Sequence, residues 1–126
     1  MTPPTMMIAP FSLRRDGQWL RLQNTGSRFC SATVGTAPNR RFAVEWNDLT
    51  LDDADTAMHL TFEVVLHETT NVIDIFYRRL EPSTGVLARF TNGSLADIGL
   101  AGPFRQPPVI HRGPVSTSVG LRFTPR

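Results

Sequence analysis

His59, His67 and His111 are the side chains of this 126-residue chain that ordinarily change charge between about pH 5 and 8, so acid–base chemistry would depend on them. On one continuous strand, His59 and His67 would share a face but lie about 26 Å apart, too far apart to bind one metal ion. The sequence contains no G-x-S-x-G, H-E-x-x-H or phosphate-binding glycine loop. It therefore predicts a protein that is not an enzyme.

A cluster of acidic side chains lies near the middle of the sequence. Asp52, Asp53 and Asp55 follow shortly after Asp48 and form an oxygen-rich segment, and oxygen atoms are the ligands that Ca²⁺ prefers. The segment lacks the glycine and the distal glutamate of an EF-hand loop. Two interpretations stay open, a calcium site at Asp52, Asp53 and Asp55, or a solvated acidic surface loop over Leu49–Met58 with no cofactor.

Trp19 is the candidate for an exposed aromatic ligand contact, because it follows the turn residues Asp16 and Gly17. The flat face of an exposed tryptophan can stack on the apolar side of a sugar ring, and Arg15 or Arg21 lies close in sequence. Carbohydrate is therefore a candidate ligand at Trp19, Arg21 and Arg15. The alternative is that Trp19 packs in the core.

Cys30 is the single cysteine, so the chain can form neither an internal disulfide nor a cysteine-based zinc site. Its neighbours are typical of a strand, and we expect Cys30 to be a buried, inert thiol.

Four segments alternate apolar and polar residues with a period of two, the pattern of a strand with one buried face. They are Arg41–Asn47, Leu60–Leu66, Ile73–Arg78 and Val119–Thr124. The expected core face contains Phe42, Val44, Trp46, Leu60, Phe62, Val64, Leu66, Ile73, Ile75, Tyr77, Val119, Leu121 and Phe123. Glu45, Glu63 and Asp74 then lie on the opposite face, where cross-strand salt bridges explain them without catalysis.

Five turn-prone residues, His67 to Asn71, predict an exposed bend and a β-hairpin of Ala57–His67 and Asn71–Leu80. Weaker strands are expected at Ile8–Leu13, Gln18–Asn24, Arg28–Val34, Gly85–Phe90, Leu95–Leu100 and Val109–Arg112. Short strands between turn residues predict an all-β fold, an antiparallel, jelly-roll-like β-sandwich of about seven to ten strands. A chain of 126 residues is expected to form a single domain.

The charge pattern excludes some classes of partner. All thirteen basic residues are arginines, and they are dispersed among eleven acids to give a net charge of +2. Such a mixed surface argues against nucleic acid, which favours a continuous basic patch. The chain contains no apolar run of about 18 residues that would span a membrane, and its start lacks the features of a signal peptide. It is either a short protein or a piece of a longer exported one.

Two segments resemble a β-rich module of bacterial secreted and cell-surface proteins. Residues 35–48 read GTAPNRRFAVEWND, and the module's signature strand reads G-T-A-P-N-R-R-F-V-V-E-W-N. Residues 60–73 resemble its T-F-Q-V-V-L-Y-E-x-x-N-x-I hairpin, which is also distantly similar to the nidogen-type extracellular domain. Residues 35–126 form the family-like part and residues 1–34 are divergent. The resemblance implies a non-catalytic module at the cell surface or outside the cell.

The front strands of that module have no counterpart here, which predicts an open sheet edge or an uncovered apolar face. We therefore expect a role in assembly, adhesion or scaffolding, as a homo-oligomer or with a partner protein. If residues 1–34 supply replacement strands, the chain is instead a closed monomer. A carbohydrate-binding module and a fragment of a secreted hydrolase are the alternative functions.

Overall fold

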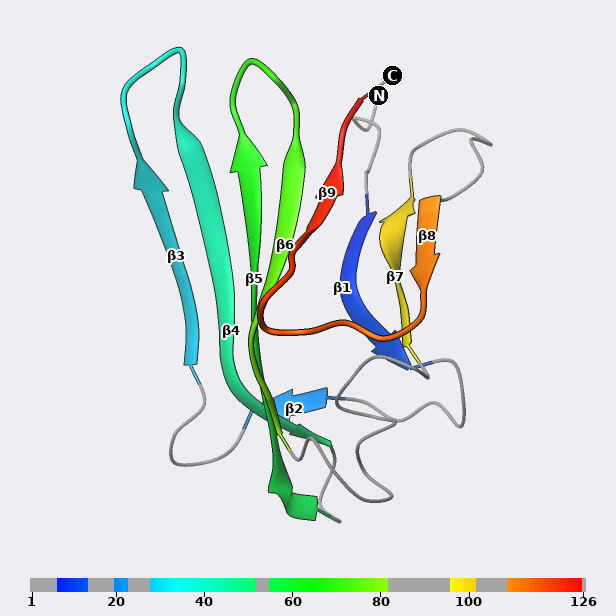
Figure 1. The fold of residues 1–126 in the computed structure, drawn as a ribbon. Helices are drawn as coiled ribbons and strands as arrows, with labels where there is room; N and C mark the ends of the chain where they lie inside the picture. The colour runs from blue at the N-terminus through cyan, green and yellow to red at the C-terminus, as the bar shows by residue number, and fades with distance from the viewer. Residues whose placement is uncertain are drawn as a thin grey trace, which may run out of the picture.

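A computed structural model describes residues 7–13, 20–22, 28–51, 55–81, 96–101 and 109–125. Within these ranges there is no helix, and every strand pairing is antiparallel. The described strands form two sheets that share one core (Figure 1). The prediction of an all-β, antiparallel fold is confirmed.

The long sheet has the order β2-β4-β5-β6-β9, with β3 beside the first part of β4. Its strands are β2 (Leu20–Leu22), β3 (Arg28–Val34), β4 (Arg41–Leu51), β5 (Asp55–His67), β6 (Ile73–Glu81) and β9 (Leu121–Phe123). The short sheet has the order β1-β7-β8. Its strands are β1 (Met7–Leu13), β7 (Ala96–Ala101) and β8 (Val109–Arg112).

The predicted β5–β6 hairpin is confirmed, with Leu66 paired to Ile73 next to the turn. Backbone hydrogen bonds close this turn from His67 N to Val72 O (3.0 Å) and from Asn71 N to His67 O (3.1 Å). The expected strands at Ile8–Leu13, Gln18–Asn24, Arg28–Val34, Leu95–Leu100 and Val109–Arg112 correspond to β1, β2, β3, β7 and β8. The expected strand at Gly85–Phe90 lies outside the described residues.

A bulge in β4 explains why the acidic loop expected over Leu49–Met58 is largely strand. Trp46 pairs with Phe62 and Leu49 pairs with Leu60, so three steps along β4 match two along β5. Asp48 lies inside this bulge with φ of 59°. The extra residue reverses the alternation and turns Leu49 into the core, where it is buried. β4 therefore continues to Leu51, and the loop prediction is wrong for that part.

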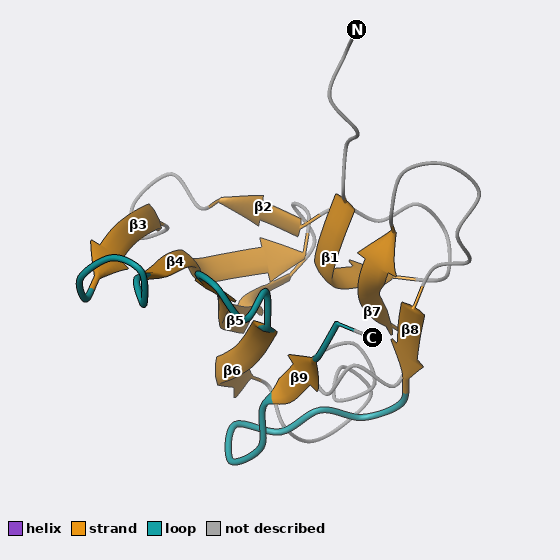
Figure 2. Ribbon diagram, turned by 90° about the horizontal axis from the view of Figure 1, so that it is seen from above, coloured by secondary structure: helices purple, strands orange, loops and turns teal. Residues whose placement is uncertain are grey.

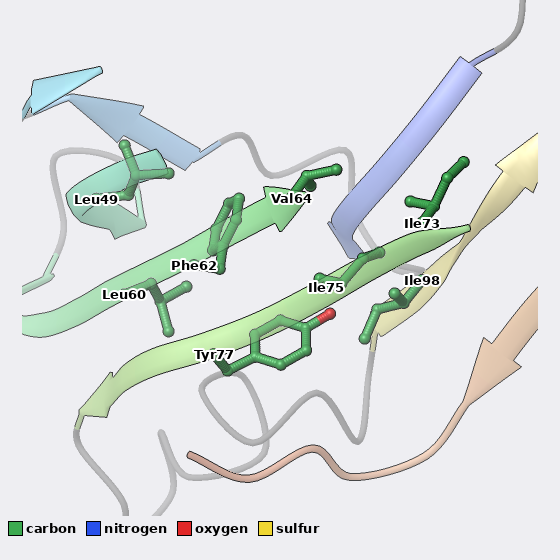
Figure 3. Packing of buried hydrophobic residues seen from close by; sticks show 8 residues of the cluster. All are labelled: Leu49, Leu60, Phe62, Val64, Ile73, Ile75, Tyr77 and Ile98. Atoms are coloured by element: carbon green, nitrogen blue, oxygen red, sulfur yellow. The ribbon is translucent and has the colours of Figure 1, made fainter. Parts of the chain in front are cut away.

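The core lies between the two sheets and is built mainly by β5 and β6. Its fully enclosed members are Leu49, Leu60, Phe62, Val64, Ile73, Ile75, Tyr77 and Ile98 (Figure 3). Ile98 projects from β7 toward Ile75 and Tyr77, so this side chain joins the short sheet to the long one. Period-two alternation thus predicted most of the core correctly, because one face of each of these strands is buried.

The short sheet does not extend over the whole inner face of the long sheet. β3 and the adjoining part of β4 lie at the end of the long sheet that is distant from β7 and β8 (Figure 2). Phe42, expected in the core, is 41% exposed, and Phe29 of β3 is 59% exposed. Cys30, expected to be buried, is exposed. The Phe42 expectation is wrong because alternation identifies a face but not the extent of its cover. Cys30 is exposed for a different reason, since it lies opposite Glu45 on the outer face of the sheet.

Val119 is a further correction to the expected core. It was placed on the buried face of the last strand, but β9 begins at Leu121 and Val119 is 65% exposed. It forms an isolated bridge with Ser116 instead.

The uneven cover predicts that truncating Phe62 and truncating Phe29, which belong to the same row of side chains, will lower the free energy of unfolding by different amounts. Phe62→Ala should lower the free energy of unfolding by about 3–5 kcal/mol, because it leaves a cavity in the core. Phe29→Ala should cost less than about 1.5 kcal/mol, because most of its ring is already in water. Urea unfolding at low protein concentration measures both values. If Phe62→Ala does not fold, Phe62→Leu replaces it, and equal losses at the two positions would contradict the partial cover.

Candidate functional site

β3 is an edge strand that is open along its full length. All seven of its residues pair with β4, from Arg28 opposite Asn47 to Val34 opposite Arg41, and all seven are exposed. No strand in the described part of the chain pairs with its other side. Alternate residues of an antiparallel edge strand direct N–H and C=O groups away from the sheet. We call this unpaired backbone of Arg28–Val34 the β3 edge.

The β3 edge lacks the features that usually protect such edges. Proline, charged side chains and bulges discourage pairing with another chain, but β3 contains neither proline nor a bulge, and Arg28 at its start is its one charged residue. The part of β6 beyond β9 differs, since it contains Arg78, Arg79 and Glu81. Charged side chains therefore protect the β6 side of the long sheet from pairing with another chain, and we call this side guarded. The β3 edge has no such protection and is unguarded.

A partly uncovered surface with two exposed phenylalanines, Phe29 and Phe42, adjoins the β3 edge. It consists of the inner-face side chains of β3 and β4 outside the shared core, Phe29, Ser31, Thr33, Phe42 and Val44, and we call it the open face. These residues alternate along the two strands and lie on the same side of the sheet as the core.

A row of aromatic rings joins the open face to the core across four strands. The ring centroids of Phe29 and Trp46 lie 5.4 Å apart in an edge-to-face arrangement. Trp46 lies 5.4 Å from Phe62, and Phe62 lies 6.3 Å from Tyr77. Ring pairs at these separations stabilise each other beyond the burial of their surface. Phe29 is therefore held in place although most of its ring faces water.

Two neighbouring turns are fastened together at the end of the long sheet, and this fixes the β3–β4 hairpin. Arg40 donates from Nε and Nη2 to the two carboxylate oxygens of Glu68, at 2.9 and 2.6 Å. The backbone N–H groups of Arg40 and Glu68 also donate to Glu68 Oε2 and Arg40 O, at 3.0 and 2.9 Å. Thr69 Oγ1 donates to the carbonyl of Pro38.

This turn-to-turn contact gives several motif residues a structural role. The hydrogen bonds from the Arg40 side chain and backbone lower the pKa of the Glu68 carboxyl to about 2. Gly35, with φ of 88°, allows the chain to turn into Thr36–Asn39, where Asn39 N donates to Thr36 O. The residues of the G-T-A-P-N-R-R-F stretch thus position β3 rather than perform chemistry.

The outer face brings two carboxylates together without forming a catalytic pair. Glu45 lies directly opposite Glu63 in the register of β4 and β5. Asn47 Nδ2 donates to Glu45 at 3.2 Å, and Arg78 Nη2 lies 3.5 Å from Glu63 Oε1. Among the described residues, no three His, Cys, Asp or Glu side chains are grouped to hold a metal ion.

Asp74 is buried, although alternation placed it on the non-core side of its strand. Arg122 donates to its two carboxylate oxygens at 2.7 and 2.9 Å, and His67 Nε2 lies 2.8 Å from Oδ2. The pKa of Asp74 is lowered by the hydrogen bond from Arg122 and, to a smaller extent, by the one from His67. His67, expected to be exposed at the bend, is half-buried because it closes over this carboxylate.

Asp48 is part of a second charged cluster that the sequence analysis missed. Its carboxylate contacts His59 Nδ1 and lies 3.5 Å from Arg79 Nη1, and its N–H donates to Thr61 Oγ1 at 3.0 Å. Arg79 also binds Glu81, with Nη2 2.7 Å from Oε2. These residues are far apart in sequence, and only the register of β4, β5 and β6 brings them together. The contacts of Asp48 with His59 and Arg79 indicate a structural cluster.

The predicted ligand residues lie largely outside the described part of the chain. This holds for Arg15, Trp19, Asp52 and Asp53. Arg21 lies in β2 opposite Thr50, and Asp55 lies at the start of β5 opposite Leu51, which places their backbones only. The carbohydrate and calcium sites therefore stay predictions.

The sequence profile of the family described as NIDO related matches residues 6–120. The chain belongs to the nidogen-related family. Nidogen-related domains are non-enzymatic, β-rich modules of extracellular type. No curated protein and no solved structure shows a significant match to the chain. Within the described residues, no helix is long and apolar enough to cross a membrane.

The buried Asp74 predicts a defined pH dependence of stability. Because its pKa is lowered on folding, Asp74 stabilises the folded chain above the ordinary value of 3.8, and this stabilisation is lost as the pH falls below it. Asp74→Asn should lower the free energy of unfolding by about 1–3 kcal/mol at neutral pH. The difference from the unmodified chain should shrink below pH 3.8.

Urea unfolding at neutral and acidic pH checks this prediction. Glu63→Gln is the matched control, because its ion pair with Arg78 is long and solvated and should contribute less than about 1 kcal/mol. A loss at Asp74→Asn that does not change with pH would contradict the role given to its charge.

Proposed function

We propose that this nidogen-related chain is a non-catalytic assembly module that joins proteins by accepting an extended strand at the β3 edge. The single observation that supports this proposal most strongly is a seven-residue edge strand, exposed throughout, beside an uncovered apolar face. Strand addition uses these two features together, since backbone hydrogen bonds supply affinity and alternate side chains supply specificity. Adhesion and scaffolding at the cell surface are forms of such assembly.

The geometry of the open face matches the requirements of an added strand. A strand placed beside β3 would direct every second side chain to the side of Phe29, Ser31 and Thr33. Apolar side chains at those positions would cover Phe29, which already packs against Trp46. The Arg40–Glu68 contact holds the β3–β4 hairpin, so little backbone ordering is needed on binding.

The charged clusters support a binding role over catalysis. Asp74 and Glu68 are held by arginines, and Asp48 is held by His59 and Arg79. A general acid or base needs an unoccupied proton-transfer position facing a substrate. The carboxylates in these clusters are instead used in cross-strand and turn contacts.

Carbohydrate binding is the second candidate function, and the exposed rings of Phe29 and Phe42 favour it, because flat exposed aromatics can stack on sugars. A sugar-dependent change in tryptophan fluorescence would support this candidate through Trp46 or Trp19. The strand-acceptor proposal accounts for the exposed backbone of β3 as well, and we therefore prefer it.

A labelled peptide with the sequence of residues 28–34, carrying Cys30→Ser to prevent disulfide formation, tests strand acceptance directly. Fluorescence anisotropy should show saturable binding with Kd below about 1 mM. The same peptide N-methylated at four successive amides should bind at least about tenfold more weakly, because both of its edges then lack donors.

Variants of the chain locate the binding surface. Phe42→Ala should weaken peptide binding about fivefold or more, because it removes apolar surface beside the β3 edge. Val119→Ala is the control, since Val119 is also an exposed apolar residue but lies outside the open face. Equal binding of the two peptides, or no binding of either, would refute the strand-acceptor proposal.

A further inference from the structure

The strand that completes the β3 edge can come from a different protein or from a second copy of this chain. We infer that it comes from a second copy, with β3 of each chain pairing antiparallel about a two-fold axis at Ser31. This inference rests on the strand-acceptor function proposed above, and it adds the identity of the partner and the register of the contact.

The register follows from the length of β3. When Ser31 lies opposite its own counterpart, Arg28 pairs with Val34, Phe29 with Thr33 and Cys30 with Ala32, so all seven residues of each strand are used. A shift that places Cys30 opposite Cys30 leaves Thr33 and Val34 of each copy unpaired. Full overlap therefore favours the axis at Ser31, and an axis through the strand makes the contact self-complementary.

The side-chain rows of the two open faces then become continuous. Within one chain, Thr33 pairs with Phe42, and Phe29 pairs with Trp46. In the pair, Phe29 of one copy lies opposite Thr33 of the other copy. That Thr33 lies opposite Phe42 of its own chain. The aromatic row of each chain thus continues into an apolar row of its partner, on both sides of the axis.

Charge favours a second copy at β3 and opposes one at the other side of the sheet. From Phe29 to Val34 the strand is uncharged, and Arg28 would lie opposite Val34, so self-pairing places no like charges directly opposite each other. At the other side of the sheet, the guarded part of β6 contains the charged residues Arg78, Arg79 and Glu81. A two-fold contact through β3 uses the unguarded edge of both copies and closes the assembly at two chains.

The available surface sets the strength of the contact. Phe29 and Phe42 are 59% and 41% exposed, so together they offer about one phenylalanine side chain of apolar surface. With the backbone edge, the two copies would bury on the order of 1,000 Å² in total, which is the lower limit for a specific interface. We therefore expect a reversible pair in the micromolar range rather than a permanent dimer.

Light scattering and sedimentation over about 1–200 µM test the partner. The mass should rise from that of one 14.0 kDa chain to that of two chains and then stop. A single-chain mass throughout, together with binding of the strand peptide, would overturn the second copy as partner and leave the strand-acceptor function standing. A mass that continues to grow would overturn the closed pair.

Charge substitutions at the axis test the register. Ser31→Lys alone and Ser31→Glu alone should each weaken pairing at least tenfold, since like charges would face each other. An equimolar mixture of the two variants should restore pairing. The control is Thr117→Lys with Thr117→Glu, because Thr117 lies in an exposed turn outside the contact, and these variants should pair normally. Failure of the Ser31 mixture to recover would overturn the axis at Ser31.

Oxidative cross-linking distinguishes the two registers independently. The double variant Cys30→Ser/Ser31→Cys should form a disulfide-linked pair within minutes of mild oxidation, because directly opposite residues lie within disulfide range. The native Cys30 should cross-link several times more slowly, since it would lie diagonally from its counterpart at about 7–8 Å. Faster cross-linking of the native chain would overturn the proposed register.

Discussion

The inner face of the long sheet is enclosed around Leu49, β5 and β6 but not at β3 and the adjoining part of β4. Most other features of the molecule follow from this mismatch between the two sheets. Where cover exists, Phe62 and Tyr77 are enclosed and Ile98 joins the sheets. Where cover ends, Phe29 and Phe42 retain contact with water. Because apolar surface of this kind gains free energy from any contact that removes water, an incomplete core is also a binding surface.

The polar groups stabilise the long sheet in this partly covered arrangement. Arg40 and Glu68 connect two adjacent turns, and Asp74 connects β6 to Arg122 of β9. Each contact joins strands that are distant in sequence, so together they hold the long sheet in shape out to its uncovered edge. The edge strand is therefore presented in a fixed conformation, which is what a strand acceptor requires.

The sequence predicted the parts of the molecule that depend on local pattern. Alternation located β4, β5 and β6 and most of their buried residues, and turn chemistry located the β5–β6 hairpin. It could not predict the exposure of Phe42, because cover depends on the size of a second sheet. It also could not predict that of Cys30, because the register with β4 places Cys30 opposite Glu45 on the outer face. Alternation also did not predict the Asp48 bulge, because a bulge changes the pattern at one residue only. It did not predict the His59–Asp48 contact either, because strand register brings together residues that are eleven apart. The resemblance suggested an open edge, and it did not identify the strand.

The central claim is that the β3 edge is free in the single chain and is covered on association. Hydrogen–deuterium exchange of backbone amides at several protein concentrations tests it most directly. Amides of β3 should exchange quickly in the dilute chain and become at least tenfold slower at about 200 µM, while those of β5 stay slow throughout. Strong protection of β3 at every concentration, or exchange in β3 that never changes, would contradict the claim.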